Sequence, residues 1–218
     1  MIISYLGKSL VKIQVGDLVI AINPRDKDDT GKTVKFGADI VLISSSDSDH
    51  SSIESVTYGS KIPFVIDTPG EFEVAGAYIT GLHTDTIEVG KSKLFPTGKK
   101  FNTSFCILLE GITVCHLGSQ EDDVISGDII EKMGEIDVLS LPIGGEGILS
   151  PEKAYKLAKK LDPKIIIPIS YGGSDPKKGA LSEFLKEMGA EKISPQEKLV
   201  LKKKDLEGKE EEVIVLTQ

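Results

Sequence analysis

Hydrophobic and polar residues alternate with two different periods along this chain, and the period changes near the middle. In the first third, apolar residues recur every second position or in short runs, which is typical of β-strands. Turn-forming pairs such as Gly16-Asp17 and Asn23-Pro24 separate these runs. The pattern predicts a meander of three strands, ISYLGKS, LVKIQVG and LVIAINP, followed by strands in DIVLIS, PFVIDTPG and, around Ala75-Gly76, EFEVAGAYITGLHTD.

The second half has strands and helices in alternation. The segment TSFCILLEGITVCHLG predicts a β-hairpin, and LVLKKKD and EEVIVLTQ predict two terminal strands that pair with each other or across a dimer. Helical spacing occurs in DDVISGDIIEKMGE, SPEKAYKLAKKLD and KKGALSEFLKEMGA, and strands are predicted in IDVLSLPI and KIIIPIS. Ser150 and Pro151 provide the N-cap and first turn of the second helix. Strands followed by strand and helix in alternation indicate an α/β protein with sheets packed together and helices outside.

Two polar stretches interrupt this pattern. Arg25 to Lys35 is unpatterned and predicts a loop, and the Gly, Lys and Thr content of Ile87 to Asn102 predicts a flexible excursion near the working face. No repeat, low-complexity tract or linker divides the chain, so residues 1–218 are expected to form a single domain.

Composition and charge exclude several classes of protein. The chain is 39% hydrophobic and 28% charged, as ordinary globular proteins are. Its net charge of -8 argues against a nucleic-acid partner, because phosphate contacts need clustered Lys and Arg. The one basic run, Lys202 to Lys204, is followed by EGKEEE and is expected on a solvated hairpin. No run is apolar enough to span a membrane and the N-terminus looks like a strand, so the cytoplasm is the expected compartment.

Two cysteines lie in the predicted hairpin. If Glu110-Gly111 is the turn, Cys106 faces Cys115 in a non-hydrogen-bonded pair, where two sulfurs are close enough to oxidise. Two cysteines make no secreted disulfide framework, and cytoplasmic thiols are normally reduced. Two buried, reduced thiols are therefore expected.

The stretch ISSSDSDH, residues 43–50, ends an apolar run with hydroxyls, two carboxylates and one of three histidines. Polar residues after a strand commonly form a turn and cap the next element, which needs no chemistry. The same residue types also suit a metal-binding loop, since carboxylates and imidazoles are the usual ligands there. Both interpretations are open at this point.

Eight blocks carry a resemblance over nearly the whole chain: YLGKS, AINP, ISSSDSDHSS, PGEFEVAGAYITGLHTD, GKKFNTSF, ITVCHLGS, IDVLSLPIGG and IIIPISYGG. In this order they resemble the metallo-β-lactamase fold superfamily, and within it the ascorbate-6-phosphate-lactonase-like branch of hydrolases. The resemblance implies an α/β fold, a four-layer αβ/βα sandwich of two mixed β-sheets flanked by helices, with a metal site at one edge. It also implies substrates that are esters, lactones or phosphorylated small molecules.

The metal-binding motif of that family is T-H-x-H-x-D-H after a strand, and here it is altered. By the resemblance, Ser44 stands for the Thr, Ser45 for the first His and Asp47 for the second His, whereas Asp49 and His50 match. Alternate residues leaving a strand point the same way, so the family's two histidines can hold one ion.

The other ligand positions are altered in the same way. Ser119 takes the place of the family's bridging Asp, Ser170 that of its last His, and Lys8 that of a His at the rim. His83 matches a further imidazole of the first metal site. Because serine hydroxyls are poor ligands beside imidazole or carboxylate, the resemblance predicts a degenerate metal site without a dinuclear zinc centre.

Two functions follow, and the sequence leaves both open. The first is a non-catalytic binding or interaction module, with a small anionic molecule as ligand because Lys8 replaces a metal ligand. The second is a hydrolase with one divalent ion, Mn, Mg or Zn, held by Asp47, Asp49, His50 and His83, in which Asp49 orients the attacking water. No nucleophile elbow or cysteine with a base beside it suggests covalent catalysis.

Overall fold

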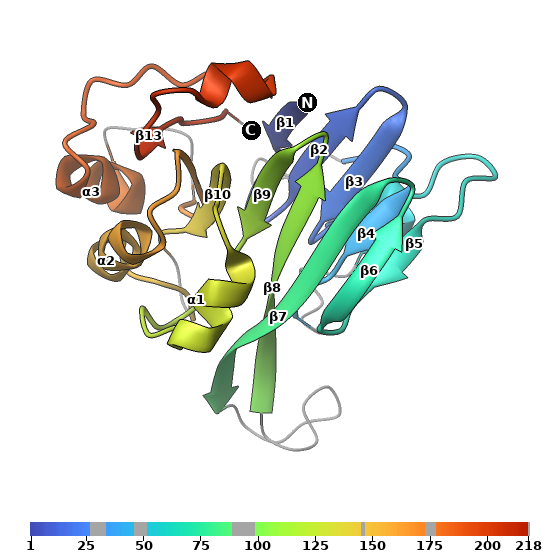
Figure 1. Ribbon diagram of the computed structural model, residues 1–218, viewed down its shortest axis with the longest axis horizontal. Helices are drawn as coiled ribbons and strands as arrows, with labels where there is room; N and C mark the ends of the chain where they lie inside the picture. The colour runs from blue at the N-terminus through green and yellow to red at the C-terminus, as the bar shows by residue number, and fades with distance from the viewer. Residues whose placement is uncertain (27–33, 46–51, 89–98, 145–146, 173–177, 218) are drawn as a thin grey trace.

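The computed structural model describes residues 1–26, 34–45, 52–88, 99–144, 147–172 and 178–217. They form two mixed β-sheets flanked by helices, and this confirms the expected α/β sandwich (Figure 1). The first sheet has the strand order β12-β1-β2-β3-β4-β5. Its strands are β1 (Ile2–Tyr5), β2 (Val11–Val15), β3 (Leu18–Ile22), β4 (Ile40–Leu42), β5 (Phe64–Ile66) and β12 (Leu199–Val200).

The first sheet follows the predicted meander. Strands β1, β2 and β3 are antiparallel neighbours, and their alternating residues turn toward the core or away from it. Strand β4 pairs in parallel with β3 and β5, and all three of its residues are buried, which explains its unbroken apolar sequence IVL. Ile43, Ser44 and Ser45 therefore lie where β4 ends.

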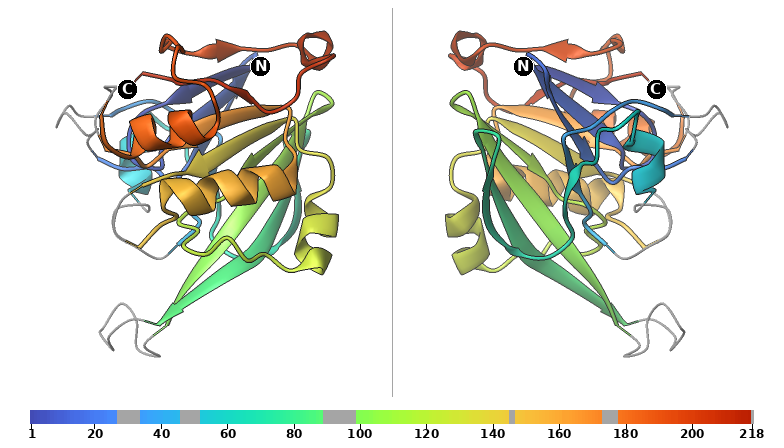
Figure 2. Two further views of the ribbon diagram at one scale, coloured as in Figure 1. Left: turned by 90° about the vertical axis from the view of Figure 1, so that its left-hand side faces the viewer. Right: turned by 90° about the vertical axis from the view of Figure 1, so that its right-hand side faces the viewer.

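The second sheet has the order β13-β11-β10-β9-β8-β7-β6. The long β7–β8 hairpin extends beyond the body of the molecule (Figure 2). The pairs β6–β7, β7–β8 and β8–β9 are antiparallel. The pairs β9–β10, β10–β11 and β11–β13 are parallel. The strands are β6 (Gly70–Val74), β7 (Ala77–Glu88), β8 (Lys99–Leu109), β9 (Ile112–His116), β10 (Val138–Pro142), β11 (Ile165–Ile169) and β13 (Glu212–Val213).

Helices α1 (Gly127–Met133), α2 (Pro151–Leu161) and α3 (Gly179–Glu187) lie together on one side of the second sheet (Figures 1 and 2). As predicted, Ser150 is the N-cap of α2 and Pro151 begins its first turn. The outer face of the first sheet is covered by Phe36 and a 3-10 helix, Ile53–Val56. A second 3-10 helix, Lys203–Leu206, precedes β13. No helix in the described ranges is both long and apolar enough to cross a membrane.

Three expectations about elements need correction. The terminal strands do not pair with each other, because β12 pairs with β1 and β13 pairs with β11, each at the edge of a different sheet. Helix α1 begins only at Gly127, after an irregular stretch. The expected excursion from Ile87 to Asn102 begins and ends in strands instead, because β7 continues to Glu88 and β8 begins at Lys99. Most of the predicted loop between Arg25 and Lys35 lies outside the described residues.

The expectation of reduced thiols is also wrong. The predicted register is confirmed, with Leu109 opposite Ile112 and Cys106 opposite Cys115, but the two sulfurs form a disulfide. The physical reason is the close approach of a directly opposite cross-strand pair, whose Cα atoms are 4.1 Å apart. The cysteines therefore give no support to a reducing compartment, and a cytoplasmic location stays a prediction.

The basic run does not lie on a hairpin face. Lys203 belongs to the 3-10 helix, and its Nζ lies 2.9 Å from the buried carboxylate of Asp137, which also accepts from Lys164 Nζ at 2.8 Å. Burial raises the pKa of Asp137, but hydrogen bonds from Lys164, the Thr113 amide and Lys203 outweigh it and hold the pKa below its ordinary value. This ionic cluster ties the start of β10 to the C-terminal segment.

Candidate functional site

A pocket of about 440 Å³ opens beside the end of β4, where the sequence placed the altered metal loop. It is lined by Ser44, Ser45, Asp67, Pro69, His83, Phe101 and Thr103. The structure thus brings together Ser45 and His83, two of the predicted site residues that are far apart in sequence. Its size lies within the range of small-molecule pockets.

Two serines at the end of β4 form the polar wall of this pocket. Ser44 and Ser45 are 2% and 4% exposed, and neither hydroxyl has a hydrogen-bond partner among the described residues. The backbone of Ser44 is held on both sides, since its amide donates to Asn23 Oδ1 at 2.9 Å and its carbonyl accepts from the Thr103 amide at 2.8 Å. Unpaired buried hydroxyls are costly in a protein interior, so both are available to a ligand or a water molecule.

A β-bulge in β7 shapes the opposite wall. The register between β7 and β8 shifts between His83 and Asp85, so that His83 is exposed in the pocket while Thr84 is buried. The His83 ring lies 5.3 Å from the ring of Phe101, centroid to centroid. Phe101 is 50% exposed, and the two rings form an aromatic surface at the entrance.

The segment that carries Ser119 follows β9 and lies against Ser44. Gly118 has a φ of +64°, and a Cβ atom there would be 2.6 Å from Ser44 Cβ and 2.4 Å from Asn102 Oδ1, so only glycine fits. The Gly118 amide donates to His116 Nδ1 at 2.9 Å. His116 Nε2 is therefore the protonated nitrogen, and it donates to the carbonyl of Ser9 at 2.9 Å. His116 is a buried structural histidine.

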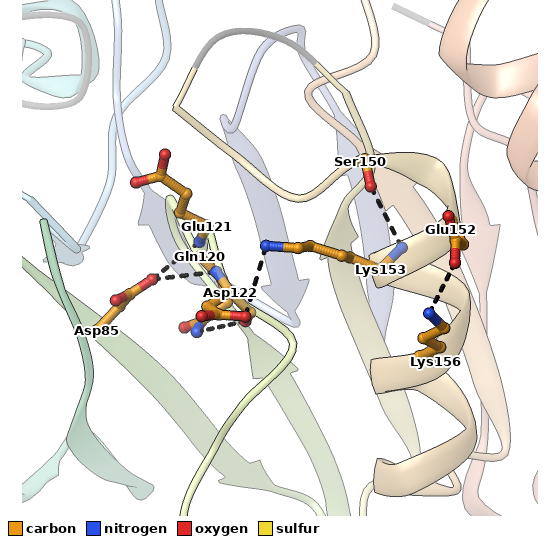
Figure 3. Close-up of polar contacts among 8 residues, drawn as sticks. All are labelled: Asp85, Gln120, Glu121, Asp122, Ser150, Glu152, Lys153 and Lys156. Carbon is orange, nitrogen blue, oxygen red and sulfur yellow. Dashed lines mark hydrogen bonds and ion pairs between the residues drawn. The ribbon is translucent and has the colours of Figure 1, made fainter.

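The next residues, Gln120 to Asp122, are held from two sides (Figure 3). Asp85 Oδ2 accepts from the amides of Glu121 at 3.0 Å and Asp122 at 3.3 Å. From the other side, Lys153 of α2 approaches the carboxylate of Asp122 at 3.5 Å. The bulge of β7 thus positions both His83 in the pocket and the turn after Ser119.

Lys8 and Ser170, predicted to replace family histidines, contact each other directly. The Ser170 amide and hydroxyl both donate to the Lys8 carbonyl, at 2.7 and 3.0 Å. Both residues have left-handed backbones, with φ of 59° for Ser170 and 46° for Lys8. The Ser170 hydroxyl proton is therefore already used within the protein.

The described residues do not fit a two-metal centre. Among them, no group of three or more His, Cys, Asp or Glu could hold an ion. Only neutral hydroxyls are offered by Ser45, Ser119 and Ser170, which the sequence resemblance aligns with two imidazoles and a carboxylate of the family. The predicted ligands Asp47, Asp49 and His50 lie outside the described residues, so a site that includes them stays a prediction.

Several residues of the site were missed from the sequence. Asp67 directly follows β5, and a carboxylate at the end of an apolar run was a usable signal. Asn102 gave no such signal, because the sequence placed it at the end of the expected excursion and only the structure places it in β8. Phe101 and Asp85 gave none, since their place depends on the bulge.

A family model described as a beta-lactamase superfamily domain matches residues 2–170. The chain belongs to this superfamily. The resemblance carried by the eight sequence blocks is thereby confirmed, together with the metallo-β-lactamase fold.

Named relatives extend the comparison. A protein of Lysinibacillus sphaericus named "UPF0173 metal-dependent hydrolase" is 28% identical over 202 residues, which covers 80% of this chain and 86% of that protein. A Thermotoga maritima structure, provisionally described as a Zn-dependent hydrolase of the metallo-β-lactamase superfamily, is 29% identical. It has a TM-score of 0.73 and the match covers 99% of this chain and 97% of the other. A metallo hydrolase from Ignicoccus hospitalis, 18% identical with a TM-score of 0.62, shows the same fold over 99% of this chain and 94% of its own.

Proposed function

We propose that this protein binds a small molecule in the pocket beside β4 and works as a binding module that has lost most metal ligands of its superfamily. One observation carries the proposal: the hydroxyl of Ser170, one of three serines that the sequence resemblance aligns with metal ligands, donates its proton to the Lys8 carbonyl. Neutral hydroxyls do not hold zinc as imidazoles do. The unpaired hydroxyls of Ser44 and Ser45 support a ligand that can hydrogen-bond to them.

The lining favours an uncharged ligand over the anion that Lys8 suggested. Among the lining residues are a carboxylate, Asp67, and the aromatic ring of Phe101, and none of those described is Lys or Arg. A carboxylate repels an anion but accepts hydrogen bonds from hydroxyl groups, and an aromatic face packs against the apolar side of a ring. An anionic ligand stays a second prediction.

A matched pair of probes tests this proposal. Glucose and glucose 6-phosphate present the same hydroxylated ring, the first without a charge and the second with one. Binding of each is followed by changes in NMR chemical shifts in the wild type, in Ser45→Val and in a distant control variant, Ser150→Ala. The proposal expects glucose to shift signals of the pocket in the wild type and control but not in Ser45→Val. Preference for the phosphate would favour the anion instead, and shifts unaffected by Ser45→Val would place binding elsewhere.

The second candidate is a hydrolase with a single divalent ion, and the names of the relatives support it. Asp47, Asp49, His50 and His83 would hold the ion, and His83 lies in the pocket beside Ser45. Manganese, magnesium or zinc would supply Lewis acidity for the hydrolysis of an ester or lactone.

Elemental analysis separates the two candidates. The protein is purified without chelator, incubated with zinc or manganese and compared with the double variant Asp49→Ala, His50→Ala. If the wild type holds about one ion per chain and the double variant loses it, the metal site is established. The hydrolase would then replace the binding module as the proposed function. Substoichiometric metal that the double variant leaves unchanged is the result expected for a binding module.

A further inference from the structure

The side chain of Asn102 in β8 connects three segments near the pocket. It is 1% exposed, and its Oδ1 accepts from the Ser119 amide at 2.7 Å. Its Nδ2 lies 2.8 Å from the Leu117 carbonyl, 3.0 Å from Thr84 Oγ1 and 3.3 Å from Gln120 Oε1, and its two hydrogens are shared among these acceptors. One buried amide thus joins β8, the bulge of β7 and both ends of the segment that follows β9.

The orientation of this amide is determined by its backbone partners. A backbone N–H can only donate and a backbone carbonyl can only accept. The Ser119 N–H therefore requires the oxygen of Asn102, and the Leu117 carbonyl requires its nitrogen. An Asp at this position would place a carboxylate oxygen against the Leu117 carbonyl, so the site specifically requires an amide.

The same residue limits how the segment Leu117–Gln120 packs. The left-handed Gly118 lies so close to Asn102 Oδ1 and to Ser44 that a Cβ atom would overlap both. Leu117 and Gln120 have backbone contacts of their own, since the Leu117 amide donates to Ser140 and the Gln120 carbonyl accepts from Leu149. Between them, the Ser119 amide depends on the Asn102 side chain.

We propose that Asn102 is a positioning residue that fixes Ser119 and the segment Leu117–Gln120 against the pocket wall at Ser44. The geometry of this segment is then set by direct hydrogen bonds within the protein, before any ligand binds. The inference goes beyond the proposed function and applies equally to a binding module or a hydrolase, because it concerns how Ser119 is held and not what it holds.

Residue-resolved amide hydrogen exchange tests the proposal. In Asn102→Ala, the Ser119 amide loses its acceptor, and its exchange is expected to be about tenfold faster than in the wild type. Ser104→Ala is the matched control: Ser104 is equally buried and bonds Thr84 Oγ1 at 2.8 Å and the Leu117 carbonyl at 3.4 Å, but it does not bond Ser119. Amides of β10 report global stability.

The expected result is faster exchange at Ser119 in Asn102→Ala, with β10 unchanged and with Ser104→Ala like the wild type at Ser119. Equal acceleration at Ser119 and β10, or the same effect in both variants, would mean general destabilisation and overturn the positioning role. If Asn102→Ala does not fold, the wild type decides: a scalar coupling across the hydrogen bond from the Ser119 amide nitrogen to the Asn102 side-chain carbonyl supports the proposal. Its absence from spectra that resolve equivalent couplings in the sheets would refute it.

Discussion

Replacing Asp137 by Asn tests the ionic cluster at the start of β10. The side chain is 2% exposed, and its two oxygens accept from Lys164 Nζ, Lys203 Nζ and the Thr113 amide at 2.8 to 2.9 Å. An Asn side chain keeps the volume and one acceptor oxygen but removes the charge, and its NH₂ group meets a lysine that can only donate.

The expected loss follows from these contacts. A hydrogen bond between charged groups contributes about 1.5 to 3 kcal/mol when buried, and the pair with Lys164, 27% exposed, falls at the low end of that range. Lys203 is 56% exposed, so solvent screening reduces its pair to a few tenths of a kcal/mol. The variant is therefore expected to lose about 2 kcal/mol at pH 7, or about 4 to 8 °C in Tm for a chain of this length.

The pH dependence provides the sharper test. Because the folded pKa of Asp137 lies below its ordinary value of 3.8, the carboxylate stabilises the fold above that value, and this contribution is lost as pH falls through the folded pKa. Urea unfolding should therefore show the full difference between wild type and Asp137→Asn at pH 7 and a shrinking difference below about pH 4. Glu152→Gln removes an exposed pair with Lys156 and should change nothing measurable. A difference that is absent at pH 7, or constant down to pH 2.5, would refute the reasoning.

Three further changes have defined outcomes. Gly118→Ala should lower the free energy of unfolding in urea by about 3 kcal/mol, because the new Cβ atom overlaps its neighbours and the backbone is left-handed. Gly76→Ala, at φ +80° with open space around it, should cost only about 1 kcal/mol. Equal costs would contradict the packing argument. Reducing Cys106–Cys115 should cost about 3 kcal/mol for its short loop, and an unchanged Tm after reduction verified by mass would oppose this. Ser119→Asp with Ser170→His should raise the zinc content found by elemental analysis; a folded variant with no extra zinc would show that these positions do not face one site.

Elements with a strong local pattern could be predicted from the sequence. The meander of β1 to β3 follows from alternation and turn residues, and α2 follows from Ser150, Pro151 and its apolar spacing. The hairpin register of the cysteines was equally local, because the two-residue turn at Glu110-Gly111 determines every pair.

Features that depend on distant partners could not be predicted in this way. The oxidation state of the cysteines was missed for another reason: the register predicted their close approach, but the expectation of a reducing compartment outweighed it. The sequence predicts that Lys203 is a solvated charge, because no local pattern shows that Asp137, 66 residues away, lies beside it. The pocket itself needs the bulge between His83 and Asp85, a one-residue irregularity that alternation does not reveal.

The residues that the resemblance aligns with metal ligands and the residues that hold the backbone around the pocket are different. By the resemblance, ligand positions of the superfamily correspond to Ser45, Ser119 and Ser170, whereas Asn102, Asp85 and Gly118 fix the neighbouring segments through hydrogen bonds and close packing. A change in the first set therefore leaves the contacts made by the second set in place. The chain can therefore share its fold with the Thermotoga maritima structure over 99% of its length while its own pocket presents hydroxyls. The chemistry of the pocket thus depends on its own side chains and not on the fold around them.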